Sequence, residues 1–98
     1  MTEKQIQLSK KHADGYCIPL GAVNLVCVKT DVGLVGCGGF NAPALDNFNY
    51  PTAIVKKDSG PIETIEDILI AKVTIANESA IKLGIKTGIT GKEALELL

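Results

Sequence analysis

The fold is decided by the stretch Val23–Phe40, which reads VNLVCVKTDVGLVGCGGF. Two of its segments, Val23–Val28 and Leu34–Phe40, are apolar on both faces of the strands that they would form. Such segments are typical of strands buried near the middle of a sheet. Between them, Asp31–Gly33 fits a three-residue hairpin loop that ends in a glycine with a left-handed backbone. The stretch therefore predicts a central antiparallel hairpin.

The length of this loop determines which residues face each other across the hairpin. With three residues in the loop, Thr30 opposes Leu34 and Cys27 opposes Cys37. Because directly paired β-carbons lie about 4.5–5.5 Å apart, we expect these two thiols side by side. A loop one residue longer or shorter would separate them, because side chains alternate between the two faces of a strand.

The chain before and after this hairpin also carries strand patterns. Ile6 and Leu8 alternate with polar neighbours, which is typical of a half-buried strand. Tyr16–Ile18 and Thr52–Val55 are further short apolar runs. Asn41 is a candidate N-cap for one or two helical turns ahead of the last of these strands.

The second half of the chain carries helix signals. Thr64 and Thr90 each stand three residues before an acidic residue, which is the capping-box pattern at the start of a helix. A β-branched run at residues 73–75 interrupts the first of these helices. A second helix is expected over residues 76–83, followed by Gly84 at the position where a left-handed backbone ends a helix.

Strands followed by helices predict an α+β fold. We expect a mostly antiparallel sheet from residues 1–57, with two to three helices from residues 62–98 packed on one face. Asp58–Pro61, between the two halves, has the composition of a turn. The 98 residues have room for one hydrophobic core, so residues 1–98 are expected to form a single domain.

Composition excludes several classes of function. The chain has ten lysines, eleven acidic residues and no arginine. Its net charge of −1 excludes binding of nucleic acid through bulk positive charge. No apolar run approaches the roughly 20 residues that span a membrane. The three cysteines are an odd number at spacings that fit no zinc site, which predicts a reducing, cytoplasmic location. His12 is the only histidine, so no metal site and no cofactor are expected within one chain.

The segment Gly36–Asn41 carries the most promising chemistry. Glycine allows a ligand or another chain to approach the backbone closely, and adjacent amide groups at such a bend can bind an anion. We expect a ligand site that involves Gly38, Gly39 and Asn41. Asn24, a polar residue in an apolar strand, either caps a loop or contacts the same ligand.

Cys37 lies within this segment and is the candidate catalytic nucleophile. Its thiolate could attack an acyl group while the neighbouring amides hold the oxyanion. Alternatively, Cys37 is a small buried hydrophobe and the glycines mark a bulge. Since His12 is the only histidine available as a base, the residues favour a binding module over an enzyme.

The chain resembles the YunC-like family of small bacterial and archaeal proteins, a domain of unknown function. The resemblance is carried in order by Gly15–Gly21, Asn24–Leu25, Cys37–Gly38, Ala53, Gly84–Ile85 and Gly88–Leu95. It implies a compact single domain and no particular activity. The family pattern often has an aspartate shortly after the Cys-Gly step, where this chain has Asn41, and an alanine where it has Thr52. If that carboxylate served catalysis, its absence weakens an enzymatic role here.

We therefore expect a small cytoplasmic domain that self-associates or binds a small ligand around Gly36–Asn41. The expected partners are further copies of the chain and a small-molecule or anionic ligand, with no nucleic acid and no membrane. The apolar excess on a short chain motivates self-association, because small domains bury a limited share of their surface. The alternative is a thiol-dependent enzyme that uses Cys37.

Overall fold

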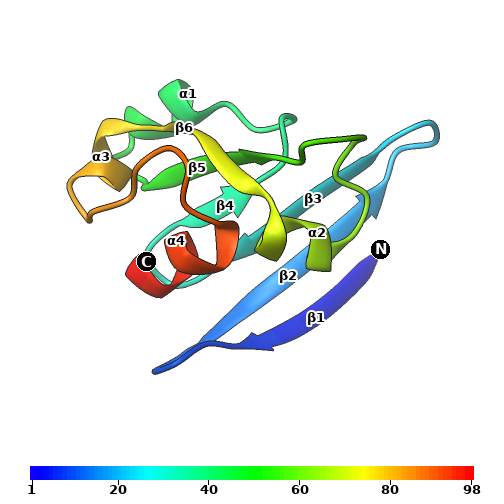
Figure 1. The fold of residues 1–98 in the computed structure, drawn as a ribbon, viewed down its shortest axis with the longest axis horizontal. Helices are drawn as coiled ribbons and strands as arrows, with labels where there is room; N and C mark the ends of the chain where they lie inside the picture. Colours follow the sequence, from blue (N-terminus) through cyan, green and yellow to red (C-terminus); the bar gives the residue numbers. More distant parts are fainter.

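The computed structural model describes all residues from 1 to 98. Its helices and strands are β1 (Thr2–Gln7), β2 (His12–Pro19), β3 (Asn24–Lys29), β4 (Leu34–Gly36), α1 (Ala42–Asp46), β5 (Thr52–Lys56), α2 (Ile65–Ile70), β6 (Lys72–Ala76), α3 (Glu78–Ile81) and α4 (Gly91–Leu97) (Figure 1). No helix is both long enough and apolar enough to cross a membrane.

The six strands form one sheet in the order in which they occur along the chain. All neighbours are antiparallel except β4 and β5, which are parallel and are connected through α1. A parallel pair needs such a crossover, because a tight hairpin can join only antiparallel strands. The predicted α+β fold with a mostly antiparallel sheet is confirmed.

The central hairpin forms, but its predicted register is wrong by one residue. Lys29 rather than Thr30 lies opposite Leu34, so Cys27 lies opposite Gly36. The loop is longer because the N–H of Thr30 donates to the carbonyl of Gly33 at 2.9 Å, which closes a four-residue turn. The expected side-by-side thiols are therefore absent.

Gly33 has a different role from the one predicted. Its backbone is not left-handed. Instead, a β-carbon at Gly33 would lie 2.2 Å from the carbonyl oxygen of Pro51, which precedes β5. Glycine is required here because β4 and the start of β5 approach closely.

The sixth strand comes from the half of the chain that was expected to form only helices. Lys72–Ala76 pairs with β5 at the edge of the sheet. Its β-branched run does more than interrupt a helix, because β-branched residues favour strands. The following helix, α3, is shorter than predicted, although Gly84 (φ +97°) has the expected left-handed backbone.

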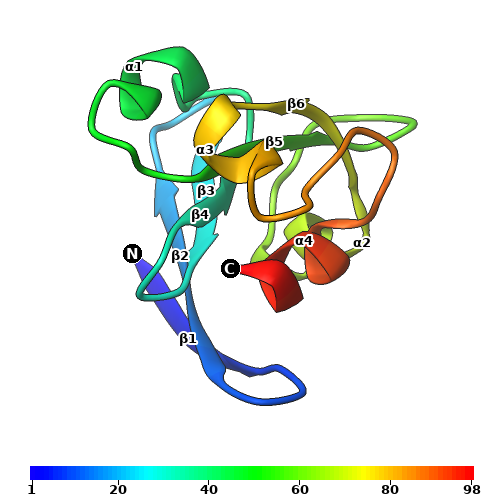
Figure 2. The same ribbon diagram turned by 90° about the vertical axis from the view of Figure 1, so that its left-hand side faces the viewer.

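Helices α2 and α4 fill the concave side of the curved sheet (Figure 2). Both begin with the predicted capping boxes, in which Thr64 pairs with Asp67 and Thr90 pairs with Glu93. The most completely buried large side chains are contributed by both layers: Ile68, Ile85, Leu95, Leu98, Val26, Val28, Val35, Val55 and Val73. The core therefore lies between α2, α4 and the middle strands.

The buried side chain of Asn77 connects three elements of the fold, although no sequence pattern indicated this role. Its Oδ1 accepts from the N–H of Thr52 at 3.1 Å and from that of Ala80 at 2.9 Å. Its Nδ2 donates to the carbonyls of Ala42 at 3.0 Å and Tyr50 at 2.9 Å. One buried amide thus joins α1, the start of β5 and α3, with every hydrogen-bonding group satisfied.

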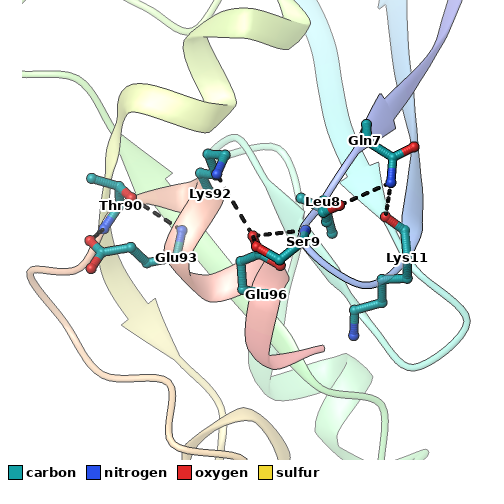
Figure 3. Close-up of polar contacts among 8 residues, drawn as sticks. All are labelled: Gln7, Leu8, Ser9, Lys11, Thr90, Lys92, Glu93 and Glu96. Carbon is teal, nitrogen blue, oxygen red and sulfur yellow. Dashed lines mark hydrogen bonds and ion pairs between the residues drawn. The ribbon is translucent and has the colours of Figure 1, made fainter.

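A carboxylate attaches the β1–β2 turn to α4, as Figure 3 shows. The N–H of Ser9 donates to both oxygens of Glu96 at 3.1 Å, and Ser9 Oγ donates to Oε2 at 2.7 Å. Lys92 Nζ lies 3.7 Å from Glu96 Oε2. Nearby, Lys11 Nζ donates to the carbonyl of Leu98. These contacts join the first hairpin to the last helix.

Gly91→Ala is expected to destabilise the protein by at least about 2 kcal/mol, as overpacking of a core does. A β-carbon at Gly91 would lie 1.9 Å from the carbonyl oxygen of Ile68, so α4 and α2 would have to separate. Helix propensity alone predicts the opposite sign, because alanine favours a helix. Urea unfolding measures the change. Gly38→Ala, where a β-carbon meets no atom within 4 Å, is the control and should change the free energy by less than about 0.5 kcal/mol. A stabilised Gly91→Ala variant would contradict this packing.

The carboxylate of Glu96 is expected to make stability depend on acid pH. The hydrogen bonds from Ser9 hold the pKa of Glu96 below its ordinary value. A depressed pKa stabilises the fold above the ordinary value and loses that stabilisation as the pH falls through the folded value, from about pH 5 downward. Glu96→Gln should therefore lose less stability than the wild type between neutral and acid pH, measured by urea unfolding across this range. Glu3→Gln, at an exposed position, is the control; a Glu96→Gln profile as steep as the wild type's would contradict the role of Glu96.

Candidate functional site

The largest cavity opens where β4 ends between two longer strands. Gly36, the last residue of β4, pairs with Cys27 of β3 and Ile54 of β5. Beyond this point β3 and β5 continue with no strand between them, and a groove of about 570 Å³ lies there. We call it the β3–β5 groove; its lining residues are Leu20, Val23–Leu25, Cys37–Gly39, Ile54–Lys57, Gly60–Ile62, Thr74 and Ile75.

The turn Cys37–Phe40 forms one end of the groove. Phe40 N–H donates to the carbonyl of Cys37 at 3.3 Å, whereas the N–H groups of Gly38 and Gly39 donate no hydrogen bond within the protein. A β-carbon at Gly39 would lie 2.6 Å from Leu25 Cδ1, so a larger residue there would displace the end of the Leu25 side chain. Gly38 faces open space. The turn thus presents two free backbone donors at a groove.

The walls of the groove are mostly apolar. Leu25, Ile54 and Ile75 belong to three different strands, and Leu20 and Val23 belong to the β2–β3 turn. Leu20 and Val23 are 60% and 59% exposed, which leaves much of their apolar surface in contact with water. An apolar ligand in the groove would remove such surface from water.

Cys37 lines this groove but is largely covered. It is 8% exposed, and its Sγ lies 3.5 Å from the N–H of Val26, which donates to it. The only histidine, His12, is at the opposite end of β2 from Pro19, which pairs with Asn24 beside the groove. At about 3.4 Å per residue, the seven steps from His12 to Pro19 span roughly 24 Å. The only histidine therefore lies far from the thiol, and no group of three or more His, Cys, Asp or Glu residues could hold a metal ion.

The remaining candidate residues are separated by the fold. Asn24 lines the groove, but its Nδ2 donates to the carbonyl of Glu63 at 2.9 Å and so anchors the loop before α2. Of its two expected roles, the structure shows the loop contact. Asn41 is outside the β3–β5 groove: its Oδ1 accepts from the N–H of Ala44 at 2.9 Å and caps α1, as predicted. It lines a smaller adjacent cavity of about 360 Å³ that it shares with Gly38 and Gly39.

Cys27 takes no part in the groove. The register places it in a row with Tyr16 and Gly36, whereas Cys37 is beyond the end of β4 and bonds to the backbone of Val26. Adjacent residues of a strand point to opposite faces, so Cys27 and Val26 face away from each other. Burial, and to a smaller extent the charge of Cys37, raise the pKa of the Cys27 thiol.

The sequence-based search missed the side of the groove that comes from β5 and the loop after it. Lys56, Lys57 and Ile62 line the groove, as does Ile75 of β6. The sequence feature that could have indicated this side is the candidate helix that begins at Asn41, between two apolar strands. A strand–helix–strand unit predicts parallel strands, whose carboxyl ends meet at one edge of the sheet and commonly form a binding crevice there.

Comparisons with known proteins agree with this fold. The family model described as "Domain of unknown function (DUF1805)" matches residues 36–98. The uncharacterized protein YunC of Bacillus subtilis (strain 168) is 31% identical over 78 residues, which cover 80% of this chain and 77% of YunC. The crystal structure of TA1206, a protein of unknown function from Thermoplasma acidophilum, superposes with a TM-score of 0.86 at 24% identity, covering 97% of this chain and 89% of that one. The chain therefore belongs to the YunC-like family of DUF1805 domains.

Proposed function

We propose that this protein is a small-molecule-binding domain whose ligand occupies the β3–β5 groove. The supporting observation is an apolar cavity of about 570 Å³ at the carboxyl ends of the only parallel strand pair. Ligand pockets typically measure about 300–1,000 Å³ and combine apolar walls with a few polar groups. Here the free N–H groups of Gly38 and Gly39 are such polar groups.

The groove is bounded by contacts within the protein. Its end is held by the close packing of Gly39 on Leu25, and one side is anchored by the hydrogen bond from Asn24 to Glu63. A site formed in advance costs less ordering entropy when a ligand binds. Burial of apolar surface, at about 25 cal/mol per Å², would supply most of the affinity.

The alternative of a thiol-dependent enzyme has weaker support. A catalytic cysteine needs an accessible thiolate that is activated by a base or a positive charge. Cys37 is mostly buried and has no histidine nearby. We therefore assign its thiol to the wall of the groove.

Self-association and a cytoplasmic location remain part of the proposal. Three cysteines without a disulfide suit a reducing compartment. Exposed apolar side chains outside the groove, such as Phe48, Ile70 and Ile81, are available to contact a second copy.

Gly38→Val is expected to abolish binding in the groove while leaving the fold intact. Gly38 lines the groove and a β-carbon there meets no protein atom within 4 Å, so we expect a valine side chain to fit without a clash and to take up space that is open to the ligand. The measurement is an NMR titration of the isotope-labelled protein with octan-1-ol, a neutral apolar probe. In the wild type, the amide shifts of Gly38, Leu25 and Ile75 should change with saturation. In Gly38→Val these changes should be lost, with an unfolding midpoint close to that of the wild type.

A matched pair of isoleucines tests where the probe binds. Ile75→Ala removes a groove wall and should weaken octan-1-ol binding several-fold, because the transfer of about three CH₂ groups is worth over 2 kcal/mol at full burial. Ile70→Ala, at an exposed isoleucine outside the groove, should leave the affinity unchanged. Equal effects of both substitutions, or no saturable shifts in the wild type, would rule out the groove as the site.

Alkylation by iodoacetamide at neutral pH distinguishes the wall role of Cys37 from a catalytic one. We expect Cys37 to react more slowly than free cysteine because it is buried, and Cys27 to react slowly because its raised pKa reduces the thiolate fraction. Cys17, which is only half-buried, should be modified first. Mass spectrometry of peptides gives the three rates. A rate at Cys37 above that of free cysteine would instead favour the enzyme.

A further inference from the structure

We propose that the ligand of the β3–β5 groove is an amphiphilic anion, with an apolar body and a carboxylate or phosphate headgroup that binds at Lys56 and Lys57. This inference rests on the proposed function, since it names the ligand class of the same groove. It follows from the charges along the groove and from the hydrogen-bond donors that the fold leaves free.

The charge along the groove has a single sign. Lys56 and Lys57 are its only charged lining residues, and no aspartate or glutamate lines it. The charge of the groove therefore differs from that of the whole chain, in which eleven acidic residues outnumber ten basic ones. A cationic ligand would meet two ammonium groups with no carboxylate, whereas an anion would meet complementary charge.

The two lysines differ in how far their charge is already compensated. Lys57 Nζ lies 3.4 Å from Asp67 Oδ1, within an ion pair that is partly covered. Lys56 makes no ion pair, so its ammonium group is free to bind a ligand. Asp67 is meanwhile occupied by the N–H groups of Glu63 and Thr64 at 2.9 and 3.1 Å, which, together with Lys57, lower its pKa and keep it ionised. Lys56 is therefore the principal headgroup contact.

The turn after β4 supplies further hydrogen-bond donors to the groove. The N–H groups of Gly38 and Gly39 have no acceptor in the protein. Because β4 and β5 are parallel, the turn after β4 and the lysines at the end of β5 lie at the same edge of the sheet. Backbone N–H groups and ammonium groups both stabilise anionic oxygens, and hydrogen bonds to a charged group are the stronger kind.

The apolar part of the groove is suited to the body of such a ligand. Leu25, Ile54 and Ile75 contribute aliphatic side chains and no aromatic ring lines the groove, so flexible aliphatic chains suit it better than stacked rings. A fully polar anion such as inorganic phosphate would leave these walls in water. The combination of aliphatic walls and unpaired positive charge thus selects an amphiphile.

The experiment compares probes with the same aliphatic body and different headgroups: octanoate, octyl phosphate, octan-1-ol and octylamine. Each is titrated into the full chain at low salt, and the amide shifts of Gly38 and Gly39 are followed by NMR. At least one anion should bind about tenfold more tightly than octan-1-ol, as expected for one charge-assisted contact. The comparison of octanoate with octyl phosphate identifies the preferred headgroup, and octylamine should bind most weakly.

Lys56→Gln should remove the preference for the anion. Its affinity for the anion should fall to about that for octan-1-ol, while its affinity for octan-1-ol stays unchanged. Lys86→Gln, at an exposed lysine that does not line the groove, is the control and should alter neither affinity. A higher salt concentration should weaken binding of the anion but not of the alcohol, because screening acts only on the charged contact.

The outcomes separate this inference from the proposed function. If octan-1-ol binds in the groove and neither anion binds more tightly, the ligand is not an anion but the groove remains a binding site. If the anion's advantage persists in Lys56→Gln, the headgroup contact at Lys56 is wrong. If no probe gives saturable shifts at Gly38 and Gly39, both the ligand class and the groove are overturned.

Discussion

The parallel pairing of the three-residue strand β4 with β5 is the constraint on which the rest of the structure depends. It forces the chain to cross over through α1, and it brings the ends of both strands to one edge of the sheet. It also separates β3 from β5 by a strand that ends early. The groove is the space that this short strand leaves unfilled.

Close contacts with neighbouring groups explain several glycines better than turn geometry does. A β-carbon at Gly36 would lie 2.5 Å from the ring of Phe40, so a side chain there would displace that ring from the end of β4. Gly39 against Leu25 and Gly91 against the carbonyl of Ile68 follow the same rule. Substitutions at these three positions therefore act on packing, whereas Gly38 is open and reports on the groove. In the glycine-rich segment, Gly36 and Gly39 are therefore in close packing contacts, whereas Gly38 is accessible.

Local patterns along the chain predicted much of this fold correctly, and the failures have physical causes. The capping boxes at Thr64 and Thr90 form as expected, because their partners are three residues apart and the geometry is local. The register of the hairpin failed by one residue, because its turn closes between Thr30 and Gly33 and because Gly33 is held by Pro51, a contact distant in sequence. The strand Lys72–Ala76 was mistaken for a break in a helix, because five residues become a strand only when β5 offers an edge to pair with.

The sequence by itself determined the α+β class and the caps of its helices, since each depends on residues that are neighbours along the chain, and it indicated Cys37–Gly39 as part of a candidate site. It did not determine that Lys56, Lys57 and Ile75 would join that segment around one groove. Only the tertiary structure decided this, because the pairing of β4 with β5 and of β5 with β6 brings together residues that no local periodicity connects. Charge and apolar surface are properties of single residues, but a site exists only where the sheet places them side by side.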